Sequence, residues 1–309
     1  MITKGNNSRF SNEVIAQIVT DNVTRRMKLG RFFPKDEIDK DSDYYTHFSQ
    51  TIDIEEAMRK GQLGEIKPVA PGVSLQELNI RKPVDKTISI NAIGGVLNVN
   101  KNMMDKNVLT VTDMLKDVSA LIRNSIEKQL ESIIFGSDKI KEFDNTSDKP
   151  IPEFIIEAQE FFKEVAGDFL DFNLALVNYR TITRIKQYLY QNNKLVEPIE
   201  EIRSYFYNDN IDVLGTAVAD GGSRIPELGY VGWDYRDAPV KLLYSQSEGT
   251  IRAPVGIAEG MNDFAPLTEV LKKVIDDELP RYTKIFIQSR VGILEEQNVK
   301  AIRGVIRQT

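Results

Sequence analysis

The longest regular pattern of hydrophobic residues lies between Val111 and Phe135. Hydrophobic side chains recur there at steps of three and four residues, which places them on one face of an α-helix. At 1.5 Å per residue this helix would extend ~37 Å. Thr110 and Asp113 resemble a capping box at its start, and Gly136 lies where a left-handed C-terminal cap would fall. The hydrophobic face comprises Val111, Met114, Leu115, Val118, Leu121, Ile122, Ile126, Leu130, Ile133 and Ile134.

The rest of the chain contains two shorter amphipathic helices and a mixed unit. One helix is predicted from about Asn12 to Leu29, inside a polar N-terminal arm, and another opens at Pro152 and ends at Gly167. The segment 220–239 is rich in turn residues, and residues 282–306 predict a strand, a turn, a short segment and a last strand. Further strands are predicted at 173–177, 211–219, 240–246 and 251–258, and helices at 181–191 and 199–207.

Residues 86–104 show the alternation of a strand, with one change of phase. Ile88 and Ile90 occupy even positions, whereas Leu97 and Val99 occupy odd ones. A bulge at the glycine pair 94–95 would explain the change and keep both halves on the same core. A strand is also predicted around the single histidine, His47, which we interpret as structural.

The segment 58–84 contains too many glycines and prolines for a helix or a central strand. These residues are Gly61, Gly64, Pro68, Pro71, Gly72 and Pro83. A segment of this length with no core of its own is either disordered or held by something outside the chain. We therefore predict a long excursion with two legs.

Composition excludes several classes of function. The 309-residue chain has a net charge of −6, no cysteine and one histidine, which argues against nucleic-acid binding as the main role, thiolate metal sites and a histidine-dependent triad. No stretch approaches the roughly 20 apolar residues of a membrane span, and the first residues lack the apolar core of a signal peptide, so we expect a cytoplasm-like compartment. The sequence predicts no catalytic residue, no cofactor and no metal site.

Other candidate motifs are better explained by structure than by chemistry. The basic cluster Arg25, Arg26, Lys28 and Arg31 is followed by acidic residues 36–43 that would neutralise it. Paired glycines match no phosphate loop, and the DNTSD and NDNID runs lack the acidic ladder of a calcium loop. Trp233, Tyr230 and Tyr235 could stack on a ligand, but we expect them to pack a loop.

The order of these segments resembles the major capsid proteins of tailed bacteriophages, which share the Hong Kong 97-type shell fold. Two segments bear the closest likeness: VNKNMMDKNVLTVTDMLKDVSALIRNSIEKQLESIIFG, for the strand end and the long "spine" helix, and SRVGILEEQNVKAIRGVI, for the final turn and strand. The resemblance implies an α+β fold with an N-terminal arm at 1–49, an extended loop at 50–88, a peripheral domain at 89–172 with 281–309 returning, and an axial domain at 173–280.

The resemblance also implies a function and partners. The chain would be a structural protein that assembles into hexamers and pentamers of an icosahedral shell around double-stranded DNA, in the virion capsid, after assembly in the host cytoplasm. Its partners would be copies of itself, a separate scaffolding protein, a portal and, by weak inner-face contact, packaged DNA, with no membrane. An encapsulin-type nanocompartment shell and a carboxylate-dependent enzyme remain alternatives.

Two sets of residues carry these expectations. The spine helix would support the fold through Val111, Leu115, Val118, Leu121, Ile122, Ile126 and Leu130. The extended loop would contact neighbouring subunits through Lys60, Gly61, Gly64, Lys67, Val69, Val73, Leu75 and Leu78. Some members of the family join a loop lysine covalently to an asparagine of a neighbour, but a lone loop lysine is usually solvated, and we expect no such crosslink here.

Overall fold

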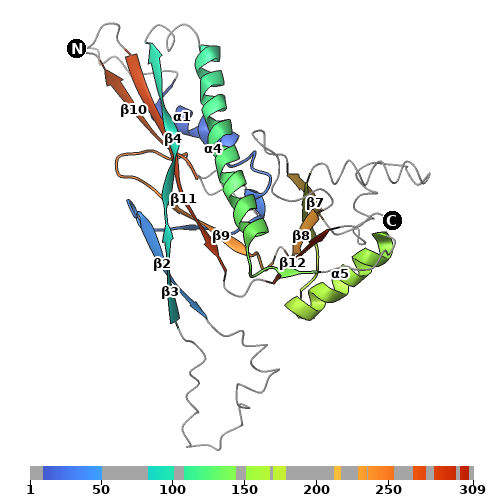
Figure 1. The fold of residues 1–309 in the computed structure, drawn as a ribbon. Helices are drawn as coiled ribbons and strands as arrows, with labels where there is room; N and C mark the ends of the chain where they lie inside the picture. Colours follow the sequence, from blue (N-terminus) through green and yellow to red (C-terminus); the bar gives the residue numbers. More distant parts are fainter. Residues whose placement is uncertain are drawn as a thin grey trace, which may run out of the picture.

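The computed structural model describes residues 10–50, 83–100, 108–143, 151–167, 170–178, 212–216, 229–234, 236–253, 267–275, 282–296 and 300–305. The chain combines one long helix with two five-stranded sheets and a two-stranded ribbon (Figure 1). This arrangement confirms the α+β class that the sequence predicted.

The first sheet is built around one long strand, β11 (Tyr282–Glu295). One edge of β11 pairs antiparallel with β4 (Asn91–Asn100) over the whole length of β4. Along its other edge, residues 282–288 of β11 pair with β10 (Glu269–Ile275) and residues 290–295 pair with β9 (Val240–Ser245). The short strand β1 (Lys35–Glu37) completes the sheet by pairing parallel to β9.

The second sheet and the ribbon use the remaining strands. The order in the second sheet is β5-β12-β8-β6-β7, and the ribbon pairs β2 with β3. Their bounds are β5 (Lys141–Glu142), β12 (Ala301–Val305), β8 (Gly229–Trp233), β6 (Leu174–Asn178), β7 (Asp212–Thr216), β2 (Tyr44–Gln50) and β3 (Pro83–Ser89).

Each sheet combines strands from segments that the sequence assigned to different domains. Strands β9 and β10 come from the segment expected to be axial, yet they pair with β11 beside β4. Strands β5 and β12 come from segments expected to be peripheral, yet they extend the sheet that contains β6, β7 and β8. One hydrophobic core contacts both sheets, and the stacked rings of Phe33 and Trp233, with centroids 5.6 Å apart, lie within it.

Helix α4 (Val108–Gly136) packs against the first sheet and confirms the long helix. Val111, Leu115, Ile126 and Leu130 are fully buried, and Ile122 is 2% exposed. Val118 is partly buried against the same core.

Leu121 does not belong to the buried face of α4, and its prediction was wrong. Its side chain is 66% exposed. It lies six residues after Leu115, which turns it about 120° away around the helix. Ile122, one residue further, completes two turns from Leu115 and returns to the core.

Both ends of α4 differ from the prediction. The helix begins at Val108, so Thr110 lies within its first turn and does not cap it. Gly136 is the last helical residue and has no positive φ. Arg303 of β12 replaces the expected glycine cap, because its guanidinium donates to the carbonyl oxygen of Phe135 at 2.8 Å and to that of Ser137 at 3.1 Å.

Helix α1 (Asn12–Val23) is shorter than predicted and belongs to the core. Ser11 caps it by accepting a hydrogen bond from the backbone N–H of Val14. Ile15, Val19 and Val23 are fully buried, so this part of the expected arm is packed against α4 and β10. Helix α5 (Ile151–Ala166) ends as predicted at Gly167, whose φ is 87°.

The carboxylate of Glu127 in α4 holds the chain that follows α1. It accepts hydrogen bonds from the backbone N–H groups of Lys28, Leu29 and Gly30, at 2.9, 3.0 and 3.1 Å. Burial raises the pKa of Glu127 above its ordinary value, although these N–H groups favour the charged form. The turn, which leads into the short helix η1 (Gly30–Phe32), is thereby attached to the middle of the long helix.

The glycine bulge predicted in β4 is absent. The pairing of β4 with β11 is continuous through Gly94, which lies opposite Gln288, and Gly95, which lies opposite Ile287. Ile88 and Ile90 instead contact a small cluster on one face of the sheet, with Leu243 and Leu294, whereas Leu97 and Val99 face the main core on the other. The change of phase reflects two strands that are separated at Ile90: Ile88 of β3 and Ile90 pack in one cluster, and Leu97 and Val99 of β4 pack in the other.

Several strands were missed or interrupted by the sequence analysis, among them the short strands β1 and β5. The turn-rich segment contains β8, whose residues are all buried. Strand β10 was not predicted, and β11 continues through the turn expected near Gly292. The strands predicted at 173–177 and 240–246 are confirmed as β6 and β9, and that at 211–219 is confirmed over the described part, β7. The predicted helices 181–191 and 199–207 and most of the predicted strand 251–258 lie outside the described residues.

Candidate functional site

The β2–β3 ribbon stands away from the two sheets (Figure 1). Its register runs from Tyr44 opposite Ser89 to Gln50 opposite Pro83. It therefore confirms the strand around His47 and supplies two paired legs at the ends of the predicted excursion. The predicted loop residues Lys60, Gly61, Gly64, Lys67, Val69, Val73, Leu75 and Leu78 lie outside the described residues.

The chain that leads into the ribbon is fastened to strand β9. The backbone N–H of Ile38 donates to the carbonyl of Tyr244 at 2.9 Å, and that of Asp41 donates to the carbonyl of Gln246 at 3.0 Å. Asp41 has a φ of 56°, a left-handed conformation that aspartate tolerates better than most residues. The chain turns sharply at this point before it enters β2.

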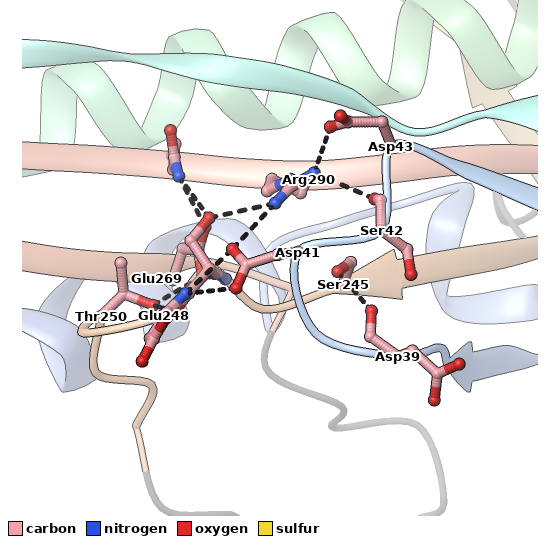
Figure 2. Close-up of polar contacts among 11 residues, drawn as sticks. Asp39, Asp41, Ser42, Asp43, Ser245, Glu248, Thr250, Glu269 and Arg290 are labelled. Carbon is pink, nitrogen blue, oxygen red and sulfur yellow. Dashed lines mark hydrogen bonds and ion pairs between the residues drawn. The ribbon is translucent and has the colours of Figure 1, made fainter.

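Arg290 of β11 joins this turn to the sheet (Figure 2). Its guanidinium lies 2.6 Å from the carboxylate of Asp43 and 3.5 Å from that of Asp41, and it donates to the carbonyl of Ser42 at 2.9 Å. The Arg290 side chain is only 9% exposed, whereas Asp43 is mostly in solvent. A nearly buried guanidinium needs these acceptors, because leaving its N–H groups unpaired would cost free energy.

Glu269 of β10 forms the other half of the cluster. Its side chain is 1% exposed, and its carboxylate accepts hydrogen bonds from the hydroxyls of Ser247 and Thr250 at 2.8 and 2.7 Å. It also accepts from the backbone N–H of Ser247 at 2.7 Å and from the amide of Gln288 at 2.6 Å. Glu269 therefore holds the turn after β9 at the point where β9 and β10 meet along β11.

We call this cluster the ribbon anchor, because it holds the base of the β2–β3 ribbon against the first sheet. It consists of Asp39, Asp41, Ser42, Asp43, Ser245, Ser247, Glu248, Thr250, Glu269, Gln288 and Arg290. Together with the apolar contacts of Ile88 and Ile90, its polar contacts fix the direction in which the ribbon leaves the sheet. Within the described residues, no group of three or more His, Cys, Asp or Glu side chains could hold a metal ion.

The acidic residues 36–43 were expected to neutralise the basic cluster at 25–31, but the salt bridges of the structure join them to other partners. Asp36 pairs with Lys241 at 2.9 Å and Glu37 with Arg252 at 2.7 Å, both far along the sequence. Of the basic cluster, Arg25 pairs with Asp21 in its own helix. Sequence proximity suggested the wrong partners because β1 and the following turn lie along β9.

The other motifs singled out in the sequence have structural roles where they fall within the described residues. Trp233 and Tyr230 are buried in β8, which confirms packing over ligand stacking, and Tyr235 lies outside the described residues. Glu295, at the end of β11, accepts a hydrogen bond from Ser137 and pairs with Lys139 at 3.5 Å. None of the described helices is long and apolar enough to cross a membrane.

Asp234, which follows β8, is a fully buried carboxylate that the sequence analysis missed. Burial by itself would raise its pKa, but hydrogen bonds from the Arg236 side chain and from the backbone N–H groups of Asp171 and Arg236 outweigh burial and lower the pKa to about 2. Asn173 adds a fourth donor at 3.1 Å. The charged carboxylate therefore stabilises the end of this sheet.

Acid is expected to weaken the protein through Asp234. Its pKa is about 2 in the folded chain and near 3.8 otherwise, so its contribution is present above pH 4 and is lost as the pH falls towards 2. The difference corresponds to about 2 kcal/mol. Asp234→Asn should flatten the decline of the unfolding free energy between pH 4 and 2, measured by urea denaturation. The exposed Asp138→Asn serves as control, and an unchanged decline in Asp234→Asn would contradict the assignment.

Comparison with solved structures supplies relatives of the fold. No family model and no curated protein sequence matches the chain. A virus-like particle from Pyrococcus furiosus is 12% identical, with a TM-score of 0.54 over 94% of this chain and 97% of that one. A phage-related protein from Bordetella bronchiseptica is also 12% identical, with a TM-score of 0.53 over 94% of this chain and 96% of that one.

The capsid of an empty GTA particle is similar as well. It is 8% identical, with a TM-score of 0.51 over 91% of this chain and 89% of that one. These likenesses extend over nearly all of each chain and confirm the Hong Kong 97-type shell fold expected from the order of segments.

Proposed function

We propose that this chain is the subunit of a closed protein shell, a major capsid protein of the tailed-phage type. The observation that carries the proposal is the likeness of fold to a virus-like particle over 94% of this chain and 97% of that one.

The ribbon and its anchor support a role in assembly. An isolated two-stranded ribbon is marginally stable in water, so it gains little by projecting from a monomer. In this chain, however, a nearly buried arginine and an apolar cluster hold its base in one direction. A rigidly aimed projection of this kind suits contact with a neighbouring copy.

We infer a finer architecture from the family resemblance. The copies form hexamers and pentamers of an icosahedral shell that encloses double-stranded DNA, and assembly takes place in the host cytoplasm. Residues 1–49 act as the arm, 50–88 as the extended loop, 89–172 with 281–309 as the peripheral domain, and 173–280 as the axial domain. A separate scaffolding protein and a portal complete the particle.

The proposed contact with DNA is weak. The net charge of −6 offers no general attraction to phosphate, and strong phosphate contacts would make packaging and release sensitive to salt. The inner surface of the shell then encloses the DNA without binding it tightly.

An encapsulin-type shell that stores protein cargo is the second candidate. The likeness to a virus-like particle from Pyrococcus furiosus favours this reading as much as the phage reading, because it concerns the shell and not the contents. The two candidates share every proposed contact between subunits and differ in what the shell encloses.

Imaging and content analysis test the proposal. The full chain is purified and examined by light scattering and negative-stain electron microscopy, with and without candidate scaffolding protein. Closed particles with nuclease-protected DNA support the capsid, and closed particles that enclose a protein support the cargo shell. A stable monomer at every concentration, salt and pH tried would overturn both.

Replacing residues 62–80 with a short Gly/Ser linker is expected to leave folded subunits or capsomers that do not close into shells. The segment then lacks the apolar residues, among them Val69, Val73, Leu75 and Leu78, that would bury against a neighbour. Melting temperature and particle imaging are measured together. A Gly/Ser segment of the native length is the control for the length of the loop. Normal closed particles from either variant would contradict the role of the loop.

A further inference from the structure

Arg252 follows a turn whose backbone is fixed to the first sheet. The residue before it, Ile251, exchanges two backbone hydrogen bonds with Val270 of β10, each 2.9 Å long. Thr250, one residue earlier, donates from its hydroxyl to the buried carboxylate of Glu269 at 2.7 Å. The position of the Arg252 backbone therefore does not depend on what the Arg252 side chain contacts.

The guanidinium of Arg252 is held on two sides. Its Nη1 donates to the carboxylate of Glu37 at 2.7 Å. Its central carbon lies 4.8 Å from the centroid of the Tyr244 ring, which is a cation–π contact. Glu37 and Tyr244 lie opposite each other in β1 and β9, so both contacts come from one row of the sheet. The Arg252 side chain is 9% exposed and that of Glu37 54%, so Glu37 marks the side of the guanidinium that faces solvent.

The remaining edge of the Arg252 guanidinium is unpaired. Its Nε and Nη2 atoms are both buried and have no hydrogen-bond partner among the described residues. These two nitrogens form the side-on edge of an arginine, whose parallel N–H groups match two oxygens of one oxyanion. Buried donors without a partner cost free energy, and native structures supply an acceptor for nearly all of them.

The charges around this edge restrict the kind of acceptor. The Glu37 carboxylate already balances the guanidinium, so a second anion is partly repelled, and a doubly charged anion is repelled more strongly. Tyr244 adds no negative charge, because burial, and after it the Glu37 carboxylate, raises the pKa of its hydroxyl. Since both unpaired nitrogens are buried, a bulky ligand could not reach them without rearranging the core.

We propose that the side-on edge of Arg252 binds one small, singly charged oxyanion of the carboxylate type, whose two oxygens accept from Nε–H and Nη2–H. This site goes beyond the proposed function and does not depend on whether the chain forms a shell. The bound anion supplies the missing acceptors and therefore stabilises the folded chain where β1, β9 and the turn after β9 meet. Formate, the smallest carboxylate, is the probe.

Formate binding to the wild-type chain is the first test. Equilibrium dialysis of the full chain against radiolabelled formate should give one bound formate per chain. The melting temperature should rise by about 2 °C once formate exceeds its Kd several-fold. Sodium chloride at the same ionic strength controls for charge screening. Equal responses to the two salts, or no saturable binding up to about 100 mM formate, would overturn this inference and leave the proposed function standing.

Dialysis of dissociated subunits and of any particles distinguishes a free anion from a protein carboxylate. Equal binding in both states supports a site for a free anion. Formate that binds subunits but not particles would mean that a side chain of a neighbouring copy takes this edge, and would overturn the site for a free anion.

Two substitutions locate the bound formate. Arg252→Lys keeps the positive charge but removes the paired N–H edge, so formate should bind about tenfold more weakly, or weaker still. Glu37→Gln keeps an acceptor for Nη1 and removes the nearby negative charge, so formate should bind about twofold to fivefold more tightly. Arg31→Lys is the matched control and should bind like the wild type, because Arg31 also stacks on an aromatic ring, that of Phe32 at 4.5 Å, but is exposed.

The two variants at the site are expected to shift the affinity in opposite directions. If Arg252→Lys folds and binds formate like the wild type, the anion lies elsewhere and the site is wrong. If Arg252→Lys does not fold, Glu37→Gln decides, because unchanged or weaker binding in that variant would also overturn the site. An equal loss in Arg31→Lys and Arg252→Lys would show general attraction to surface charge and would overturn it as well.

Discussion

Ile122→Ala is expected to lower the free energy of unfolding by about 2–5 kcal/mol, as typical for truncating a large aliphatic side chain in a core. Ile122 is 2% exposed at the middle of α4, within the cluster that contacts both sheets. The loss combines the hydrophobic free energy of the removed methyl and methylene groups with the cavity they leave. Chemical denaturation of the soluble subunit, followed by circular dichroism, measures it.

Leu121→Ala provides the matched control one residue away. The same helix loses a similar volume, but from a side chain that is 66% exposed, so the change should stay within about 0.5 kcal/mol. Equal effects of the two substitutions would show that the buried face of α4 has been assigned to the wrong side of the helix.

Gly94→Ala is expected to destabilise the first sheet by at least the ~1–3 kcal/mol typical of overpacking. A Cβ atom at this position would overlap the carbonyl oxygen of Ile287 and lie 2.6 Å from the Cα of Gln288. Backbone atoms cannot swing aside as a side chain can, so β4 and β11 would have to separate locally. The melting temperature and the soluble yield of the variant report the effect.

Gly95→Ala tests the same chemistry at the next residue. A Cβ atom there meets nothing within 4 Å. Alanine also restricts the unfolded chain more than glycine does, so the variant should be as stable as the wild type or slightly more stable. A loss of stability similar to that of Gly94→Ala would mean that the approach of β11 to Gly94 is not the cause.

Local patterns in the sequence were sufficient for several elements. The long helix was predicted because its apolar residues follow the helical period for seven turns, and α5 ended at a glycine that adopts a positive φ. Apolar runs likewise predicted β6, β7 and β9. Each of these predictions depends on neighbours within a few residues, which is the range over which periodicity and capping act.

The errors occurred where a residue's environment depends on distant segments. Strand β8 looked like part of a turn because glycine, proline and aspartate residues surround it, yet it lies between β12 and β6 with all of its residues buried. The change of phase after Ile90 suggested a bulge, because the sequence cannot tell one core from two clusters on opposite faces.

The ribbon anchor could not have been predicted from the sequence. Arg290 lies more than two hundred residues from Asp43, and ordinary polar residues such as Ser247 and Gln288 carry no motif. The sequence by itself determined the long helix and the class of fold, because these follow from local pattern and from the order of segments. The tertiary structure alone decided which strands share a sheet and which charges meet, because both depend on contacts between segments that the chain brings together only when it folds.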